Sequence, residues 1–274
     1  MEGRSPYLDA NVARTYARFA APAQFARPAQ DLVELLDIPI GAHVLDVGTG
    51  TGVVARAMAA RIGAAGRVAG VDASIEMLRA GACDRRHPVL VARVPDLPFR
   101  NAAFDAVAAS FVITHVDSYV DGLAELVRVC RSGGRIGVTT WGTLPNPAGA
   151  LWKDVASTFG VGQQLADAFR RAIPWDEWLS TAANLADALR AARVSDVNVV
   201  TREFVIRIPA LDYVAMKNAT VEGTLLRALL SRTDWDRFVQ HVTAALQTRF
   251  GDVVSYRRDF HVGIGATGGR GTQP

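Results

Sequence analysis

Residues 44–52 decide the fold and read Val44-Leu45-Asp46-Val47-Gly48-Thr49-Gly50-Thr51-Gly52. An apolar run with one acid ends in three glycines at alternate positions, which is typical of a strand that turns tightly into a helix. A second apolar run, residues 68–71, ends at Asp72. Strand, glycine turn, helix, strand and acid form the unit with which α/β proteins bind nucleosides. Glycines let the backbone approach a ligand closely, and Asp72 is placed to accept hydrogen bonds from the hydroxyls of a ribose.

Spacing separates this turn from two other nucleotide sites. A phosphate-binding P-loop needs a Lys after its last glycine, whereas the chain continues with residues 53–56, Val-Val-Ala-Arg. A dinucleotide fingerprint needs its third glycine at position 53, which is Val53. The motif is instead D-x-G-x-G-x-G, from Asp46 to Gly52.

These residues resemble the first motif of the class I S-adenosylmethionine-dependent methyltransferases. The segments Leu97-Pro98-Phe99 and Phe104-Asp105-Ala106-Val107, and the run from Leu126 to Arg135, are similar to the ubiquinone/menaquinone-biosynthesis-like (type 11) subgroup. The similarity covers about residues 43–141. It implies a doubly wound, seven-stranded Rossmann-like α/β sheet with an antiparallel last strand.

The alternation of apolar runs predicts the order of the elements. Expected helices are 9–20, 29–37, 52–62, 74–81 and 118–131, followed by helices to about 192 and over 209–249. Expected strands are 43–47, 68–71, 89–94, 104–113, 135–140, 194–208 and 253–263. Near-continuous apolar strands between helices indicate a parallel sheet covered on both faces. The fifth of these helices should begin at Ser118 and stop at Gly133-Gly134.

One domain is expected over residues 1–266. It would comprise an N-terminal helical lid (1–40), a cofactor-binding core (41–141), and cap helices with the last two strands (142–266), before a flexible tail (267–274). The five tryptophans, all after residue 140, could pack the cap helices or wall an apolar substrate pocket.

The resemblance implies a set of residues that hold S-adenosylmethionine. Asp46, Gly48, Thr49, Gly50 and Gly52 would frame its methionine end, and Asp72 would hold the ribose. The other expected contacts are Ala73, Met77, Arg93, Val94, Ser110, Phe111 and Tyr16. Arg93 departs from the pattern, because similar proteins carry there an Asp that binds the adenine amino group.

His115 is the candidate general base, because it follows the fourth strand and should lie at the carboxyl edge of the sheet. Its alternative role is to contact the cofactor or to cap the next helix. Asp117 is the second catalytic candidate, although an Asp before a helix is usually an N-cap. Tyr16 would either pack its helix or close over the cofactor, where an aromatic face attracts a sulfonium.

The composition indicates which kinds of binding partner and which cell compartment to expect. The formal charge is +3 with no long basic block, which does not favour nucleic acid. Cys83 and Cys130 predict neither a metal site nor a disulfide framework, so a reducing cytoplasm is expected. The sequence contains no apolar run long enough to span a membrane. The sequence is compatible with a homodimer.

The sequence therefore predicts a cytoplasmic methyltransferase of secondary metabolism. Its acceptor would be a small, largely apolar molecule, methylated on oxygen by in-line displacement, with carbon and nitrogen as the alternative positions. Two alternatives stay open: a protein that uses the cofactor for another reaction, such as a cyclisation, and a non-catalytic subunit that activates a partner. The acceptor itself is not predicted.

Overall fold

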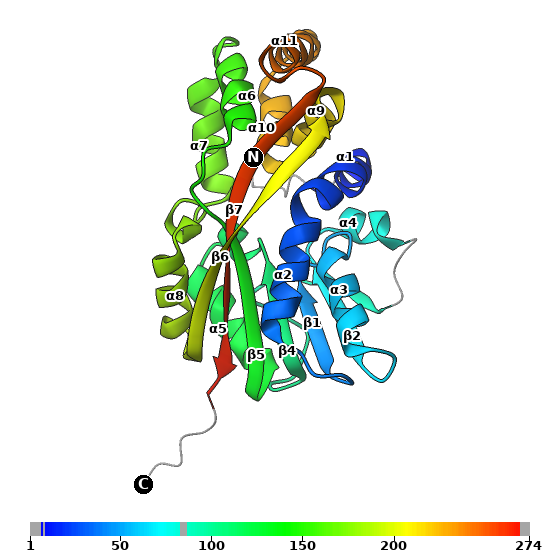
Figure 1. Cartoon of the computed structure of the whole chain (residues 1–274), viewed down its shortest axis with the longest axis vertical. Helices are drawn as coiled ribbons and strands as arrows, with labels where there is room; N and C mark the ends of the chain where they lie inside the picture. The colour runs from blue at the N-terminus through cyan, green and yellow to red at the C-terminus, as the bar shows by residue number, and fades with distance from the viewer. Residues whose placement is uncertain (1–6, 8, 83–86, 269–274) are drawn as a thin grey trace.

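The computed structural model describes residue 7 and residues 9–82 and 87–268. Its centre is a seven-stranded sheet in the order β3-β2-β1-β4-β5-β7-β6 (Figure 1). The strands are β1 (His43–Val47), β2 (Arg67–Asp72), β3 (Val89–Val91), β4 (Phe104–Ser110), β5 (Cys130–Trp141), β6 (Val194–Pro209) and β7 (Val253–Thr267). The first five are parallel, and β7 runs antiparallel to both neighbours. The doubly wound α/β prediction is confirmed.

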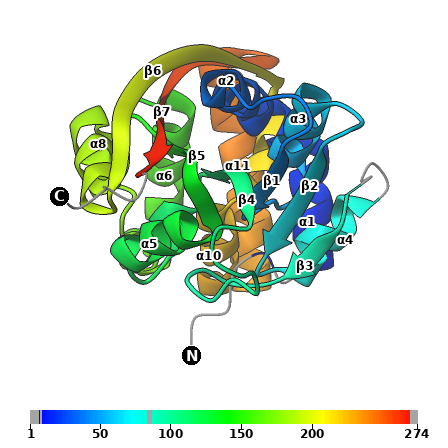
Figure 2. The ribbon, with the colours of Figure 1, turned by 90° about the horizontal axis from the view of Figure 1, so that it is seen from below.

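Helices cover both faces of the sheet, which explains why its strands are apolar on both sides (Figure 2). One core contains residues of α5 (Tyr119–Val129) and α8 (Ala182–Ala191). The other core contains residues of α2 (Ala26–Leu36) and α3 (Val53–Ile62). The short α4 (Ile75–Ala80) lies beyond β2, where its N-cap Ser74 accepts a hydrogen bond from Met77 N.

The two expected N-terminal helices form one continuous helical segment, and the predicted break between them is wrong. After α1 (Ala10–Thr15) the backbone widens into a π-helix over Tyr16–Phe25 and then enters α2 without a loop. Pro22 lies inside the π-helix. It lacks the N–H that an α-helical turn requires, and a local π turn is one way in which a helix accommodates such a defect.

Three other boundaries differ from the sequence prediction for local reasons. β3 ends at Val91 instead of Val94. β4 ends at Ser110, because Phe111 has a φ of 57° and turns the chain into a 3₁₀ helix over Ile113–His115. α5 starts after Ser118 as expected but ends at Val129. Gly133 and Gly134 belong to β5, near an irregularity in its pairing with β4.

A two-stranded ribbon carries the chain beyond the sheet. β5 pairs only with residues 260–266 of β7, whereas β6 pairs with β7 from Val194–Thr267 to Pro209–Val253. The remaining halves of β6 and β7 therefore extend past the carboxyl ends of the parallel strands, toward the cap helices (Figure 1). The last strand runs to Thr267, so residues 264–267 extend it beyond the expected end; residues 269–274 of the predicted tail lie outside the described residues.

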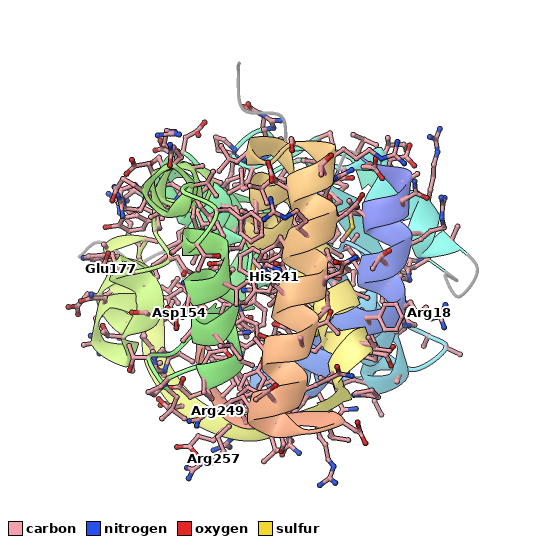
Figure 3. All side chains as sticks on the ribbon, turned by 90° about the horizontal axis from the view of Figure 1, so that it is seen from above. Arg18, Asp154, Glu177, His241, Arg249 and Arg257 are labelled. Atoms are coloured by element: carbon pink, nitrogen blue, oxygen red, sulfur yellow. The ribbon has the colours of Figure 1, made fainter. Side chains whose placement is uncertain are left out.

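The cap has a hydrophobic core of its own. Its helices are α6 (Pro147–Ser157), α7 (Gly162–Ala172), α9 (Ala210–Asn218), α10 (Val221–Leu229) and α11 (Arg232–Phe250). Trp152, Tyr213 and Phe238 are fully buried among them. Seen from above, α6 and α11 lie side by side over the carboxyl edge, and Arg249 and Arg257 lie at the rim (Figure 3). In the described part of the chain, no helix combines the length and apolar character that crossing a bilayer requires.

Candidate cofactor and acceptor site

The glycine turn between β1 and α3 has a backbone that side chains would disrupt. Gly48 and Gly50 have φ values of 66° and 54°, in the left-handed region. A Cβ on Gly48 would lie 2.2 Å from Cγ2 of Val112, and one on Gly50 would lie 3.3 Å from the terminal methyl of Met77. The turn therefore packs closely against the loop after β4 and against α4, and it exposes backbone instead of side chains.

Asp72 joins the second strand to this turn. Its Oδ2 accepts a hydrogen bond from Gly50 N at 2.8 Å, and its Oδ1 accepts one from Ser74 N at 2.8 Å. Burial raises the pKa of the carboxyl above its ordinary value. Each carboxylate oxygen has further lone-pair capacity, so Asp72 retains the ability to accept hydrogen bonds from a ligand.

Asp46 stabilises the start of the helix that follows the glycine turn. It is buried, and its Oδ2 accepts a hydrogen bond from Ala55 N at 2.9 Å, which fixes the first turn of α3. Burial raises its pKa to about 7, with a smaller contribution in the same direction from Asp72. Asp46 is not among the residues that line the cavity described next, so its contact with the methionine end of a cofactor would be indirect.

A cavity of about 330 Å³ lies between the carboxyl edge of the sheet and the cap. This volume lies within the range of small-molecule sites. Most of the expected cofactor residues line it, namely Gly48, Thr49, Gly50, Asp72, Ala73, Met77, Ser110, Phe111 and Tyr16. Of the expected residues, Asp46, Gly52, Arg93, Val94 and Asp117 do not.

Arg93 and Val94 lie away from the cavity, because β3 ends before them. Arg93 is exposed and forms an isolated bridge with Asp96. Val94 is buried in the core under α5, where a Cβ on Gly122 would lie 3.4 Å from its Cγ1. Neither side chain replaces the missing adenine-binding Asp in this structure.

His115 lines the cavity from the 3₁₀ helix after β4. The residue keeps an exposed surface, whereas the desolvation of its imidazole lowers its pKa to about 4. The imidazole is therefore neutral at physiological pH and has one nitrogen that accepts a proton. Asp117 is exposed and outside the cavity, and Ser118 instead caps α5 by accepting a hydrogen bond from Asp121 N at 3.2 Å.

Aromatic rings that the sequence analysis did not assign complete the wall. Tyr7 packs edge-on against Tyr16, which stacks on Phe25 with ring centroids 5.3 Å apart. Phe25 contacts both Phe111 and Trp141, and the last two stack at 4.0 Å. Of the five tryptophans, Trp141 lines the cavity, whereas Trp152 lies in the core of the cap.

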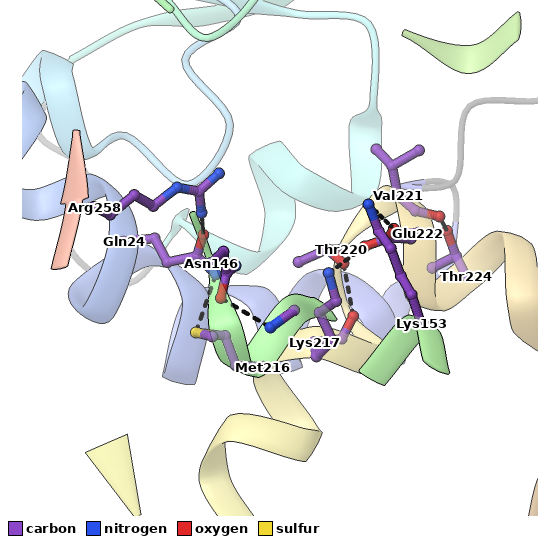
Figure 4. Close-up of polar contacts among 11 residues, drawn as sticks. Gln24, Asn146, Lys153, Met216, Lys217, Thr220, Val221, Glu222, Thr224 and Arg258 are labelled. Carbon is purple, nitrogen blue, oxygen red and sulfur yellow. Dashed lines mark hydrogen bonds and ion pairs between the residues drawn. The ribbon is translucent and has the colours of Figure 1, made fainter. Parts of the chain in front are cut away.

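Polar side chains line the cap half of the cavity, and these were also missed. They are Gln24, Asn146, Asp176, Lys217, Glu222 and Arg258. Figure 4 shows Arg258 directed at Gln24, and Lys217 and Lys153 both directed at Glu222. The two ammonium groups lower the pKa of Glu222, against the effect of its burial. These residues come from six separate elements and loops, so no local spacing pattern connects them.

Several features of the cavity suit the binding of S-adenosylmethionine. Its floor is glycine backbone with no room for a Cβ at Gly48. Thr51 on the same turn has a buried hydroxyl without a hydrogen-bond partner among the described residues. A carboxylate stands at the tip of β2, where a ribose is expected, and aromatic faces able to attract a cation line the rest. In the described residues, no group of three His, Cys, Asp or Glu side chains could hold a metal ion.

Comparison with known proteins also indicates a methyltransferase domain. Residues 45–138 match the family model described as "Methyltransferase domain". A ubiquinone/menaquinone biosynthesis C-methyltransferase from Geobacter sp. (strain M21) is 36% identical over 120 residues, which cover 41% of this chain and 50% of that protein. The chain thus spans about half the length of the first curated relatives that it matches.

Two further proteins extend over more of the chain. Nocamycin O-methyltransferase from Saccharothrix syringae is 29% identical over 216 residues, covering 70% of this chain and 74% of that protein. The structure of phosphoethanolamine N-methyltransferase 2 from Haemonchus contortus, solved with S-adenosylhomocysteine, has a TM-score of 0.52 and 19% identity. The match covers 89% of this chain and 53% of that chain, and at this identity it supports the fold alone.

The sheet order and the glycine-turn cavity together define a protein of the class I S-adenosylmethionine-binding fold. Residues 45–138 match the methyltransferase-domain family model, and this part of the chain is similar to class I S-adenosylmethionine-dependent methyltransferases of the ubiquinone/menaquinone type. The domain match and the glycine-turn cavity support S-adenosylmethionine as the cofactor of this domain.

Proposed function

We propose that the protein transfers a methyl group from S-adenosylmethionine to an oxygen of a small acceptor with a largely apolar body. The observation that carries the proposal is that one cavity joins the glycine turn and Asp72 to the aromatic and polar residues of the cap. Cofactor and acceptor would then meet in one enclosed space. The relative named for nocamycin supports a role in secondary metabolism.

The main task of the protein's residues would be to bind the cofactor and the acceptor and to orient them for methyl transfer. Asp72 would hold the ribose and the backbone of residues 48–50 the methionine end, whereas Tyr16, Ser110 and Phe111 would close the cofactor from the other side. The bound cofactor supplies a methyl group activated by positively charged sulfur. Holding the acceptor oxygen in line with that methyl can lower the barrier by about 7–11 kcal/mol.

His115 would take the proton of the acceptor hydroxyl. It lines the same cavity, and its lowered pKa keeps the imidazole in the form that accepts a proton. A positioned base contributes roughly 10²–10⁴ in rate. Asp117 is not proposed for this role, because it is exposed and outside the cavity.

A binding measurement followed by a product measurement tests the proposal. S-adenosylhomocysteine at about a hundredfold excess over its Kd should raise the free energy of unfolding by about 2.7 kcal/mol, and NAD should not. Asp72→Ala should weaken this binding by more than about tenfold, because it removes a charged acceptor. The exposed Asp96→Ala is the matched control.

The second step is a screen of small phenols, alcohols and acids with methyl-labelled cofactor. The expected product is labelled on oxygen, with an equal amount of S-adenosylhomocysteine. Cofactor binding without label transfer would contradict methyl transfer and favour another reaction in the same cavity. Unchanged binding by Asp72→Ala would contradict the assignment of the cofactor site.

A further inference from the structure

Arg258 occupies an unusual place for a charged side chain. It lies on β7 in the ribbon beyond the sheet, where Tyr256 and Val254, two and four residues earlier, are buried against the cap. Alternate residues of a strand share one face, so Arg258 points to the same side and lines the cavity. Its neighbour Arg257 belongs to the opposite face, where it is exposed and pairs with Glu203.

The guanidinium of Arg258 uses few of its hydrogen-bond donors within the described part of the protein. Its Nη1 donates a hydrogen bond to Oε1 of Gln24 at 2.7 Å, which is its one side-chain hydrogen bond to another described residue. A guanidinium carries five N–H donors. Among the residues that the structure describes, no carboxylate lies within 4.0 Å of it. Most of the donor capacity of Arg258 is therefore unused inside the cavity.

Aromatic stacking fixes the position of this cation relative to the cofactor site. Its Cζ lies 3.4 Å from the centroid of the Trp141 ring, which in turn stacks on Phe111. Phe111 follows β4 and is one of the expected cofactor contacts. Arg258 thus lies at one end of a three-layer stack, and the other end is Phe111, where the cofactor is expected.

No carboxylate among the described residues forms an ion pair with Arg258. Glu222 is paired with Lys217 and Lys153. Asp176 lines the cavity and attracts Arg258 from beyond ion-pair distance, whereas burial raises the pKa of its carboxyl, which favours the uncharged form. A partly buried cation without an ion-pair partner is costly, and such groups in sites are normally paired when a ligand binds.

We propose that Arg258 binds a carboxylate of the acceptor, so that the substrates of this enzyme are small organic acids with an apolar body. The inference rests on the proposed function and specifies its substrate class. The planar guanidinium matches a carboxylate in two parallel hydrogen bonds, and the stack on Trp141 holds that plane fixed. The apolar remainder of the acid would lie against the aromatic wall.

The test compares acids with their amides. Benzoate, trans-cinnamate and octanoate, each beside its carboxamide, are titrated calorimetrically into the protein saturated with S-adenosylhomocysteine. At least one acid should bind about tenfold or more tightly than its amide. Arg258→Gln should remove that preference and leave the Kd of S-adenosylhomocysteine unchanged. Arg257→Gln, on the other face of the same strand, should retain it.

Three results would overturn the proposal: equal binding of acids and amides, no binding of any acid, or an undiminished preference in Arg258→Gln. Loss of S-adenosylhomocysteine binding in a folded Arg258→Gln protein would also overturn it, because Arg258 would then hold the carboxylate of the cofactor. Arg258→Lys keeps the charge and should retain part of the preference if the glutamine variant does not fold. Failure of the wild type to bind S-adenosylhomocysteine would instead contradict the proposed function.

Discussion

At the scale of single residues, burial shifts the pKa values of Asp46 and His115 in opposite directions. Burial raises the pKa of Asp46 to about 7 and lowers that of His115 to about 4. Desolvation disfavours the charged form in both, which is the anion for Asp46 and the cation for His115. Both groups are therefore neutral over part of the range in which their exposed counterparts are charged.

Asp46 should make the protein less stable as the pH rises. The carboxyl binds its proton more tightly in the folded chain, so its contribution to the free energy of unfolding falls between about pH 4 and about pH 7. Asp46→Asn cannot ionise, so its stability relative to the wild type should improve by about 2–3 kcal/mol from about pH 5 to about pH 8. Urea unfolding at both pH values measures this. A constant difference between the two proteins would contradict it.

His115 should titrate far below an ordinary histidine. An NMR titration of its ring protons is expected to give a pKa of about 4, because desolvation of the imidazole disfavours its cationic form. Turnover at saturating cofactor should accordingly not decline until the pH falls below about 5. His115→Asn should lower turnover and leave S-adenosylhomocysteine affinity intact. His241→Asn, on the exposed side of α11, should change neither, and equal turnover in both variants would leave His115 a structural role.

At the scale of elements, the glycine turn and the loop after β4 are fitted to each other. Gly48→Ala would place a Cβ against Val112 at a φ that alanine adopts only with strain, so cofactor binding should be lost. The double variant Gly48→Ala with Val112→Ala relieves the contact but not the backbone strain. It should recover part of the affinity in calorimetry with S-adenosylhomocysteine. No recovery would mean that the strain alone accounts for the loss.

At the scale of the whole molecule, one cavity connects the core, the N-terminal segment and the cap. S-adenosylhomocysteine should therefore slow hydrogen exchange in residues 48–52 and also in the π-helix, which contributes Tyr16, Gln24 and Phe25 to the wall. The helix α8 packs on the far side of the sheet and serves as the internal control. Protection confined to the core would contradict a closing role for the N-terminal segment.

The sequence by itself determined the cofactor half of this protein. The glycine turn, Asp72 and the alternation of strands and helices are local patterns, because close backbone approach and burial on both faces impose them on consecutive residues. They predicted the alternating strands and helices and the glycine turn, and the resemblance to class I methyltransferases implied the seven-stranded sheet and most of the residues around the turn. The local pattern mispredicted the ends of two strands, which backbone geometry sets. β4 ends before Phe111, whose φ is positive, and β3 ends before residues 93–94.

Only the tertiary structure decided the acceptor half. Gln24, Trp141 and Arg258 are far apart in the sequence, and each has an unremarkable neighbourhood there. They meet because the antiparallel β7 extends past the sheet and because the N-terminal helix continues unbroken to the carboxyl edge. The charge of Arg258 became informative only when the fold enclosed it without a counter-ion, since the same side chain at the surface would be solvated and would indicate no ligand.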